Sequence, residues 1–183
     1  MKILPAIDIK DKKCVRLIQG NFENTTEYET SPLEQAEKYK EHGFKNLHIV
    51  DLDGALTGQT VNLNIIQEIV GKYDLKIEVG GGVRTFDSIK RYVDIGVEKI
   101  ILGSAAIKNK EFLKEACIKF KNKIALGLDA KDGNLSVLGW KENLNIKTLD
   151  FLKDVNNYGI SRLIYTDINR DGTKESPNFE ETI

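Results

Sequence analysis

Two stretches of this sequence recur later in the chain at nearly constant offsets. Ala6-Ile7-Asp8-Ile9-Lys10-Asp11 aligns with Gly127-Leu128-Asp129-Ala130-Lys131-Asp132 at an offset of 121 residues. Four further residues match at an offset of 116: Gly43, Leu47, Asp51 and Asn62 align with Gly159, Leu163, Asp167 and Asn178. The chain therefore contains one repeat of about 120 residues and roughly half of a second copy.

Short apolar, β-branched runs alternate with helical patterns along the chain. Six such runs, each bounded by turn residues as buried parallel strands are, cover residues 3–9, 46–52, 75–79, 99–102, 123–128 and 162–168. Between them apolar residues recur at steps of three and four, which is typical of amphipathic helices. Helix starts are predicted at Ser31, Thr85 and Asn109, and helix ends at Gly43, Gly96 and Gly159. The alternation predicts an α/β fold.

Six strand–helix units fit either an open doubly wound sheet or most of a (β/α)₈ TIM barrel, and the repeat favours the barrel. Two full copies would give eight strands in about 240 residues, a typical barrel size. We therefore expect a single domain over residues 1–183, with 1–120 as the first half-barrel repeat and 121–183 as the first part of the second. About six of the eight strands would be present and the C-terminal quarter absent, because a six-stranded form would expose two strand edges.

Two aspartates occupy equivalent positions in the repeat. Asp8 ends the first predicted strand and Asp129 ends the fifth. Because active sites of parallel α/β folds lie at the carboxyl ends of the strands, we expect the two side chains to face each other across the barrel mouth. Two carboxylates can divide acid and base roles when their surroundings separate their pKa values. The alternative is that each caps a loop or pairs with Lys10 or Lys131.

A glycine-rich turn, Val79-Gly80-Gly81-Gly82-Val83-Arg84-Thr85, leads from the third strand into a helix. Consecutive glycines let backbone N–H groups converge on an anion, and an arginine can add a charged fork. The next strand ends in a second small-residue turn, Leu102-Gly103-Ser104-Ala105. Either turn alone could reflect tight packing, but together they predict a phosphate site. Neither matches a Walker loop or the full dinucleotide fingerprint.

Residues 10–30 are too many for an ordinary connection between a strand and a helix, so we expect a lid at the active face. Arg16 in this segment could reach a second anion or the substrate, or be a solvated surface residue. Gly139-Trp140 follows the fifth strand. This only tryptophan of the chain could stack on a planar heterocycle, although core packing is the usual role.

The sixth strand is followed by a polar segment, residues 166–173, that brings Thr166 and Asp171 near the same mouth. These side chains could position the acid or the substrate, or Asp171-Gly172 could simply form a turn. His48 has the strand parity of Val50, opposite to that of Asp51. We therefore expect His48 to pack outward against a helix rather than bind substrate.

Composition excludes several classes of function. The 27 basic residues nearly balance the 28 acidic ones, so no overall field draws the chain to nucleic acid or to an anionic membrane. Cys14 and Cys117 match no metal-ligand spacing, and His42 and His48 add no credible zinc site, so we expect no metal. The chain has neither an N-terminal signal-peptide pattern nor an apolar run of about 18 residues. We expect a cytoplasmic protein.

Taken together, these segments resemble the isomerase of histidine biosynthesis that acts on phosphoribosylformimino-5-aminoimidazole carboxamide ribotide. The resemblance covers essentially the whole chain. It rests on Pro5-Ala6-Ile7-Asp8, Val15-Arg16-Leu17-Ile18-Gln19-Gly20, Asp51-Leu52-Asp53-Gly54-Ala55, the triple glycine with Arg84, Gly103-Ser104-Ala105-Ala106, Leu128-Asp129-Ala130-Lys131-Asp132-Gly133 and residues 166–173. Members of this family are built from half-barrel repeats, which agrees with the internal repeat.

The resemblance implies an Amadori rearrangement of an aminoaldose to an aminoketose, without a cofactor. Asp129 would protonate the ribose ring oxygen, and Asp8 would remove the C2 proton. The residues that match the family's first phosphate site are Gly81, Gly82, Arg84, Gly103 and Ser104. Arg16 and Trp140 match positions that contact the substrate, while Thr166 and Asp171 match residues that support catalysis.

The end of the chain departs from the family pattern. A bisphosphorylated ribonucleotide substrate requires two phosphate sites, and the repeat predicts the second on strands seven and eight. We therefore expect the 183-residue chain to be inactive unless the missing quarter is supplied, and the full-length protein to be a monomer.

Two rival functions remain open. The sister cyclase subunit of imidazole glycerol phosphate synthase shares the barrel and both aspartates, but three segments resemble the isomerase more closely: residues 16–20, Asp53-Gly54-Ala55 and Gly139-Trp140. A second aminoaldose, phosphoribosylanthranilate, could also be a substrate. Alternatively, the chain could be a non-catalytic phosphate-binding barrel fragment.

Overall fold

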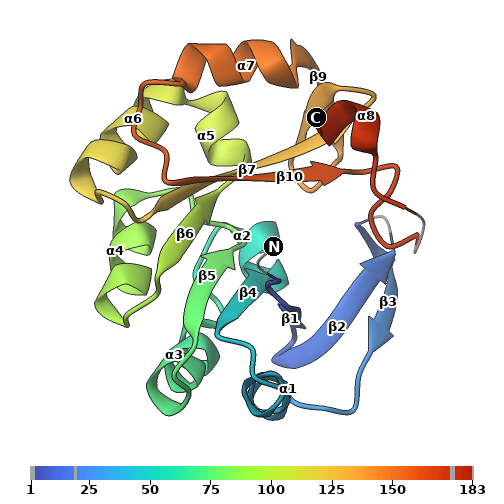
Figure 1. Ribbon diagram of the computed structural model, residues 1–183, viewed down its shortest axis with the longest axis vertical. Coiled ribbons are helices and arrows are strands. Elements are labelled where there is room, and N and C mark those ends of the chain that lie inside the picture. Colours follow the sequence, from blue (N-terminus) through green and yellow to red (C-terminus); the bar gives the residue numbers. More distant parts are fainter. Residues whose placement is uncertain (1–2, 19, 174–175, 183) are drawn as a thin grey trace. The chain divides into compact units, whose positions relative to one another are not determined.

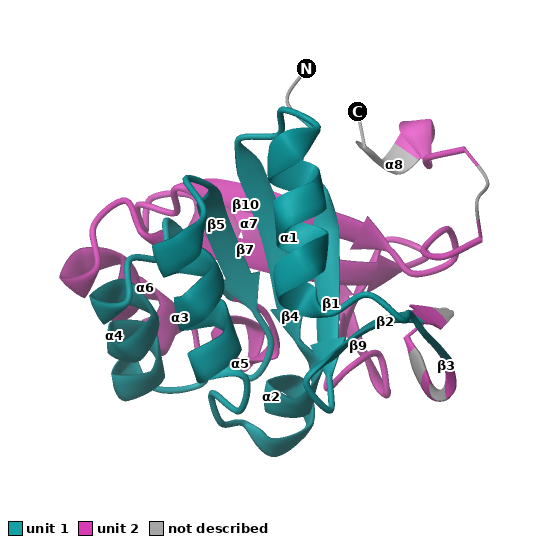
Figure 2. Ribbon diagram, turned by 90° about the horizontal axis from the view of Figure 1, so that it is seen from below, with its two compact units in different colours: residues 1–16, 26–101 teal, residues 17–25, 102–183 magenta. Residues whose placement is uncertain are grey.

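The computed structural model describes residues 3–18, 20–173 and 176–182 (Figure 1). The chain forms two compact units, coloured separately in Figure 2. The first unit comprises residues 1–16 and 26–101, and the second comprises residues 17–25 and 102–183.

Strands and helices alternate within both units. The first unit contains β1 (Ala6–Lys10), most of β2 (Lys13–Ile18), α1 (Pro32–Glu41), β4 (Asn46–Asp51), α2 (Leu52–Thr57), α3 (Leu63–Lys72), β5 (Lys76–Gly80), α4 (Phe86–Asp94) and most of β6 (Lys99–Leu102). The second contains most of β3 (Asn21–Glu27), α5 (Ser104–Lys108), α6 (Lys110–Lys119), β7 (Ile124–Lys131), β8 (Asn134–Val137), β9 (Glu142–Lys147), α7 (Thr148–Val155), β10 (Arg162–Asp167) and α8 (Phe179–Thr182).

All six predicted strands are present, as β1, β4, β5, β6, β7 and β10. The predicted helix starts are also confirmed: Ser31, Thr85 and Asn109 are the N-caps of α1, α4 and α6, and each side chain accepts a backbone N–H of the first turn. These caps explain why the helices begin where they do. An α/β fold with a mostly parallel sheet is therefore confirmed.

In the first unit, β1, β4, β5 and β6 pair in parallel in that order. Asp8 stands opposite Val50 of β4. The core beside this sheet is apolar: Leu47 and Ile49 of β4, like Ile66 and Ile69 of α3, are 0% exposed. Burying side chains of this size is the main favourable contribution to the fold.

Residues 10–30 are not the long irregular loop that the sequence predicts. They contain β2 and β3, and β2 pairs antiparallel with β1, with Lys10 opposite Lys13. The two turn residues between them, Asp11 and Lys12, both have positive φ, 50° and 64°. That geometry is typical of a type I′ hairpin turn, which is usually indicated by Asn-Gly or Asp-Gly. Asp-Lys lacks this signal, so the sequence does not predict the hairpin.

The second unit repeats this arrangement of strands. β7 pairs in parallel with β10, where Asp129 stands opposite Thr166, and antiparallel with β8, which in turn pairs with β9. The turn between β7 and β8 is Asp132-Gly133, with φ of 52° and 70°. Strands β8 and β9 were not predicted from the sequence, although Asp132-Gly133 is a usual hairpin signal and Leu144 and Ile146 of β9 alternate with polar residues.

The registers of the two units coincide at the offsets of the sequence repeat. Asp8 lies opposite Val50 in the first unit, and Asp129 lies opposite Thr166 in the second. Asp8 and Asp129 are 121 residues apart in the sequence, and Val50 and Thr166 are 116 residues apart. The matched segments therefore have the same strand pairing as well as similar sequences.

A buried carboxylate holds the end of β4. Asp51 is 0% exposed and accepts hydrogen bonds from Gly54 N (2.8 Å), Asn62 N (3.0 Å) and Asn62 Nδ2 (2.7 Å). The Asn62 amide also donates to Asp53 Oδ2 at 2.8 Å. These bonds cap α2 and fix the start of α3, because a buried carboxylate needs several donors. The repeat equivalent of Asn62, Asn178, donates to Asp167 Oδ2 at 2.7 Å.

The Asp51 cluster yields a stability prediction. Replacing Asn62 with alanine removes the amide that donates to the buried Asp51 and the half-buried Asp53, so Asn62→Ala should lower the free energy of unfolding by roughly 2–3 kcal/mol. The matched variant Asn178→Ala removes the equivalent amide where Asp167 and Asn178 are only half-buried, and should cost less than half as much. Urea unfolding of both variants measures the difference. Equal losses, or no measurable loss for Asn62→Ala, would contradict this account.

Candidate functional site

Asp129 lies on β7 in the second unit, and its surroundings shift its pKa. Burial raises the pKa of this carboxyl above its usual range, and the negative charge of Asp171 adds to the rise. Hydrogen bonds from the side chains of Trp140 and Thr166 oppose it, because they stabilise the ionised form. The net direction is upward, so Asp129 holds a proton more readily than an exposed aspartate does.

Three elements bring these groups to Asp129. Thr166 stands directly opposite on β10, and Asp171 lies in the turn after that strand, where its N–H donates to Asp167 O at 3.0 Å. Trp140 lies in the short connection between β8 and β9. An indole N–H can only donate, so the Asp129 carboxylate is its acceptor. The structure thus brings together four of the predicted site residues.

The carboxylate of Asp8 lines a pocket of about 250 Å³ in the first unit. Arg16 lines the same pocket, so two further predicted residues share one cavity. Tyr28 and Tyr39 also line it, and no motif in the sequence pointed to them. Burial and the Asp8 charge raise the pKa of the Cys14 thiol in this pocket to about 11, which leaves it protonated and unreactive at neutral pH.

Asp8 and Asp129 belong to different units. Each carboxylate is therefore described with its own neighbours, and the placement of the two across one barrel mouth stays a prediction.

The glycines of the predicted phosphate turn are in close contact with backbone. A Cβ on Gly81 would lie 2.1 Å from Asp51 O, and a Cβ on Gly82 would lie 1.9 Å from Gly54 O. Both glycines also have positive φ, 103° and 72°. Tight packing alone is therefore sufficient to require glycine at both positions. Phosphate binding by this turn stays a prediction.

Arg84 has a protein partner in the first unit. Its Nη2 donates to Ala55 O at 2.8 Å, near the end of α2. Its guanidinium also passes so close to Gly58 that a Cβ there would lie 2.6 Å from Arg84 Nη1. Arg84 thus tethers α2, and any contact with an anion would be additional to this bond.

Ser104, at the start of α5, is joined to the segment that carries Trp140. Its Oγ accepts a hydrogen bond from Leu138 N at 2.9 Å. Gly103, the residue before it, is the N-cap of α5 and supplies no side chain. The Ser104 hydroxyl, which the sequence predicts to bind phosphate, therefore holds the connection between β8 and β9 in place.

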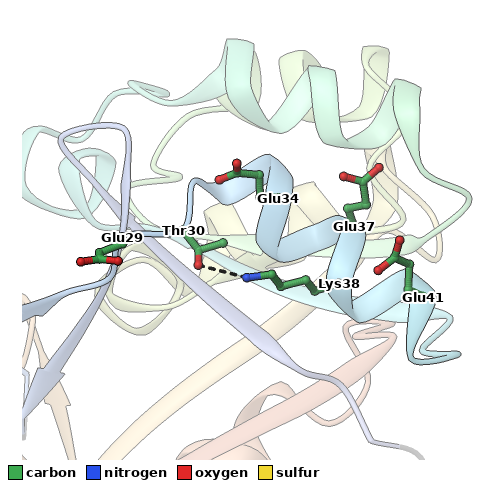
Figure 3. A pocket seen from close by; sticks show the side chains of 6 residues that line it. All are labelled: Glu29, Thr30, Glu34, Glu37, Lys38 and Glu41. Atoms are coloured by element: carbon green, nitrogen blue, oxygen red, sulfur yellow. Dashed lines mark hydrogen bonds between the residues drawn. The ribbon is translucent and has the colours of Figure 1, made fainter.

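A larger pocket of about 350 Å³ lies along α1 and is unsuited to a phosphorylated ligand (Figure 3). It is lined by Glu29, Thr30, Glu34, Glu37, Lys38 and Glu41. Its one ammonium group donates to Thr30 Oγ1 at 3.3 Å and is outnumbered by carboxylates. One of these, Glu34, completes the capping box of α1 with Ser31. A negative lining repels phosphate.

The expectation for His48 is wrong. His48 stands opposite Ala6 in the same β1–β4 register that pairs Asp8 with Val50, so it lies on the face of the sheet that carries Asp8. Its Nδ1 lies 2.7 Å from Oε1 of Glu78, which is 4% exposed. The prediction failed because it took Asp51 as the reference for the active face, whereas Asp51 turns into the core to cap α2.

Two broader features concern the described parts of the chain only. Residues 3–18, 20–173 and 176–182 contain no cluster of three or more acidic, histidine or cysteine side chains arranged to hold a metal ion. Within those same ranges, none of the helices combines the length and the apolar character that crossing a membrane requires.

Comparison with known proteins gives a consistent result. The family model described as "Histidine biosynthesis protein" matches residues 2–183. The chain is 81% identical, over all of its length and 76% of the relative, to the 1-(5-phosphoribosyl)-5-((5-phosphoribosylamino)methylideneamino)imidazole-4-carboxamide isomerase of Pelagibacter ubique. Enzymes of the same name are similar in Desulfitobacterium hafniense (43% identical, 100% of this chain and 73% of the relative) and Clostridium novyi (46%, 98% and 76%).

The family match spans nearly the whole chain, and the motifs around both aspartates fall inside it. This chain belongs to the histidine biosynthesis protein family.

Proposed function

We propose that this chain acts in an isomerase of histidine biosynthesis, which converts the aminoaldose phosphoribosylformimino-5-aminoimidazole carboxamide ribotide to its aminoketose by an Amadori rearrangement. The observation that carries the proposal is 81% identity over the whole chain to the isomerase of Pelagibacter ubique. The rearrangement oxidises one carbon of the sugar and reduces its neighbour, so it consumes no external oxidant or reductant.

Asp129 is proposed as the general acid. Opening the ribose ring requires a proton on the ring oxygen as the bond between that oxygen and C1 breaks, and the product is a protonated Schiff base. An acid for this step must hold its proton near neutral pH. The burial that raises the pKa of Asp129 supports this role. Thr166 and Asp171 are proposed to position the carboxyl and to adjust its proton affinity.

Asp8 is proposed as the general base. It removes the proton from C2 of the Schiff base, the electron pair forms the C1–C2 double bond of an enolamine, and tautomerisation then gives the ketose. Its position in the lining of a pocket supports this role, because a base must be able to reach the substrate.

Seven residues are proposed to bind the substrate. Arg16 and Trp140 would contact its body, and a first phosphate site would comprise Gly81, Gly82, Arg84, Gly103 and Ser104. The packing of Gly81 and Gly82 against the Asp51–Gly54 turn determines how this site can be tested. Variants of Gly81 or Gly82 would disrupt the fold, and Ser104→Ala would also remove the acceptor of the Leu138 N–H. A Cβ at Gly103 meets nothing closer than 3.9 Å, so Gly103→Ala is the informative change.

We also propose that the chain contributes six strands to an eight-stranded (β/α) barrel built from two half-barrel repeats. The support is the coincidence of strand registers around Asp8 and Asp129 at the offsets of the sequence repeat. A duplicated strand–hairpin–helix unit explains why both carboxylates occupy equivalent positions, two residues before the ends of β1 and β7.

The acid and base assignment predicts the outcome of two isosteric substitutions. In the complete polypeptide that the gene encodes, Asp8→Asn and Asp129→Asn should each reduce kcat by about 10²–10⁴-fold, because general acid–base catalysis contributes that much. Aminoketose formation is the measurement, and Asp150→Asn, an exposed change on α7, is the control. Wild-type turnover by either Asn variant would overturn its assignment, and no turnover by the unaltered protein would overturn the function.

The raised pKa of Asp129 predicts a stability effect independent of turnover. A carboxyl whose pKa is higher in the folded than in the unfolded state destabilises the fold when ionised, so this cost appears as pH rises. Asp129→Asn should therefore raise the melting temperature relative to wild type at pH 8, and by less at acidic pH. Thermal unfolding at several pH values measures this, and an Asn variant less stable than wild type at pH 8 would contradict it.

A further inference from the structure

The ring of Trp140 rests on a glycine in the turn between β2 and β3. A Cβ placed on Gly20 would lie 2.5 Å from Trp140 Cε3 and 2.7 Å from Cζ3. Real Cβ atoms do not approach other atoms so closely, so only glycine leaves space for the ring in this position. Both residues belong to the second unit, as does Asp129.

The segment that carries Trp140 has an unusual backbone. Leu138, Gly139 and Trp140 have consecutive positive φ values of 57°, 63° and 68°. Non-glycine residues rarely adopt such angles unless surrounding contacts hold them there. Here the contacts are the Leu138 N bond to Ser104 Oγ on one side and the Gly20 backbone on the other.

The orientation of the indole determines where its N–H points. Trp140 has two side-chain torsions, and the ring is rigid, so fixing the six-membered ring on Gly20 also fixes the direction of Nε1. A hydrogen bond from the Trp140 side chain is among the causes that act on the pKa of Asp129, and Nε1–H is the only donor of this side chain. Any effect of Gly20 on Asp129 is therefore indirect. It acts through Trp140.

We propose that Gly20 is a positioning residue: by leaving room for the Trp140 ring, it holds the indole N–H on the Asp129 carboxylate in the substrate-free protein. Its relevance to catalysis rests on the proposed role of Asp129 as the acid. The positioning of the indole by Gly20 does not depend on that role, so the positioning and the catalytic role can be tested separately.

Losing the indole contact would change the titration of Asp129. The indole N–H stabilises the ionised carboxylate, so without it the carboxyl holds its proton to higher pH. Thr166 would remain as a donor, and Asp171 is the charged group that acts on Asp129. A side chain at position 20 should therefore move the titration of Asp129 upward.

Intrinsic fluorescence of the 183-residue chain tests this directly, because Trp140 is the one tryptophan among these residues. In the wild type, its emission should change as Asp129 titrates, and Asp129→Asn should abolish that change. Gly20→Ala should shift emission to longer wavelength and move the pH-linked change upward or remove it. The matched control is Gly43→Ala, at φ +83° with nothing within 4 Å of the added Cβ. It imposes comparable backbone strain and should leave emission unaltered.

Two outcomes would overturn the proposal: wild-type emission and titration in Gly20→Ala, or the same changes in Gly43→Ala. If Gly20→Ala folds too poorly for fluorescence, a double-mutant cycle with Trp140→Ala measures the same contact through stability. Gly20→Ala should cost more stability than Gly43→Ala, and this excess should disappear on a Trp140→Ala background. An unchanged cost on that background would also overturn it. A normal fluorescence result without isomerase turnover would reject the proposed function alone.

Discussion

A carboxylate removed from water at the end of a parallel strand must be surrounded by donors, and both units are organised around this requirement. In the first unit, Asp51 draws the N–H groups of Gly54 and Asn62 to itself and thereby fixes α2 and α3. Gly81 and Gly82 can then pack against the backbone of that turn. In the second unit, hydrogen bonds from the side chains of Trp140 and Thr166 stabilise the ionised Asp129 carboxyl.

The difference between these two acids separates a structural role from a chemical one. Asp51 is fully buried, and backbone and amide donors surround its oxygens, so its role is to hold α2 and α3 in place. Asp129 is only half-buried, its donors are two side chains, and the charge of Asp171 raises its pKa. A group of this kind can accept and release a proton, which is what the proposed ring opening requires.

Local sequence signals predicted the six parallel strands, the three helix caps and the equivalence of Asp8 and Asp129. The missed strand β2 lacks a turn signal because it follows Asp-Lys, whereas β9 is short and mostly exposed, which makes its alternation of Leu144 and Ile146 with polar residues a weak signal. Contacts between residues that are far apart in the sequence could not be predicted either. A glycine that packs on Asp51 and one that cradles a phosphate look alike in sequence, and nothing local to Gly20 indicates that Trp140 lies on it.

The central claim is that Asp129 is the acid and that its donors set its proton affinity. The pH dependence of kcat/KM in the complete protein, compared between wild type and Thr166→Val, tests this most directly. Removing the Thr166 hydroxyl removes a bond that stabilises the carboxylate, so the pKa of Asp129 should rise. The alkaline limb of the profile should therefore move to higher pH while the acidic limb, assigned to Asp8, stays in place. A shift of the acidic limb, or of neither limb, would contradict the assignment of Asp129 as the acid.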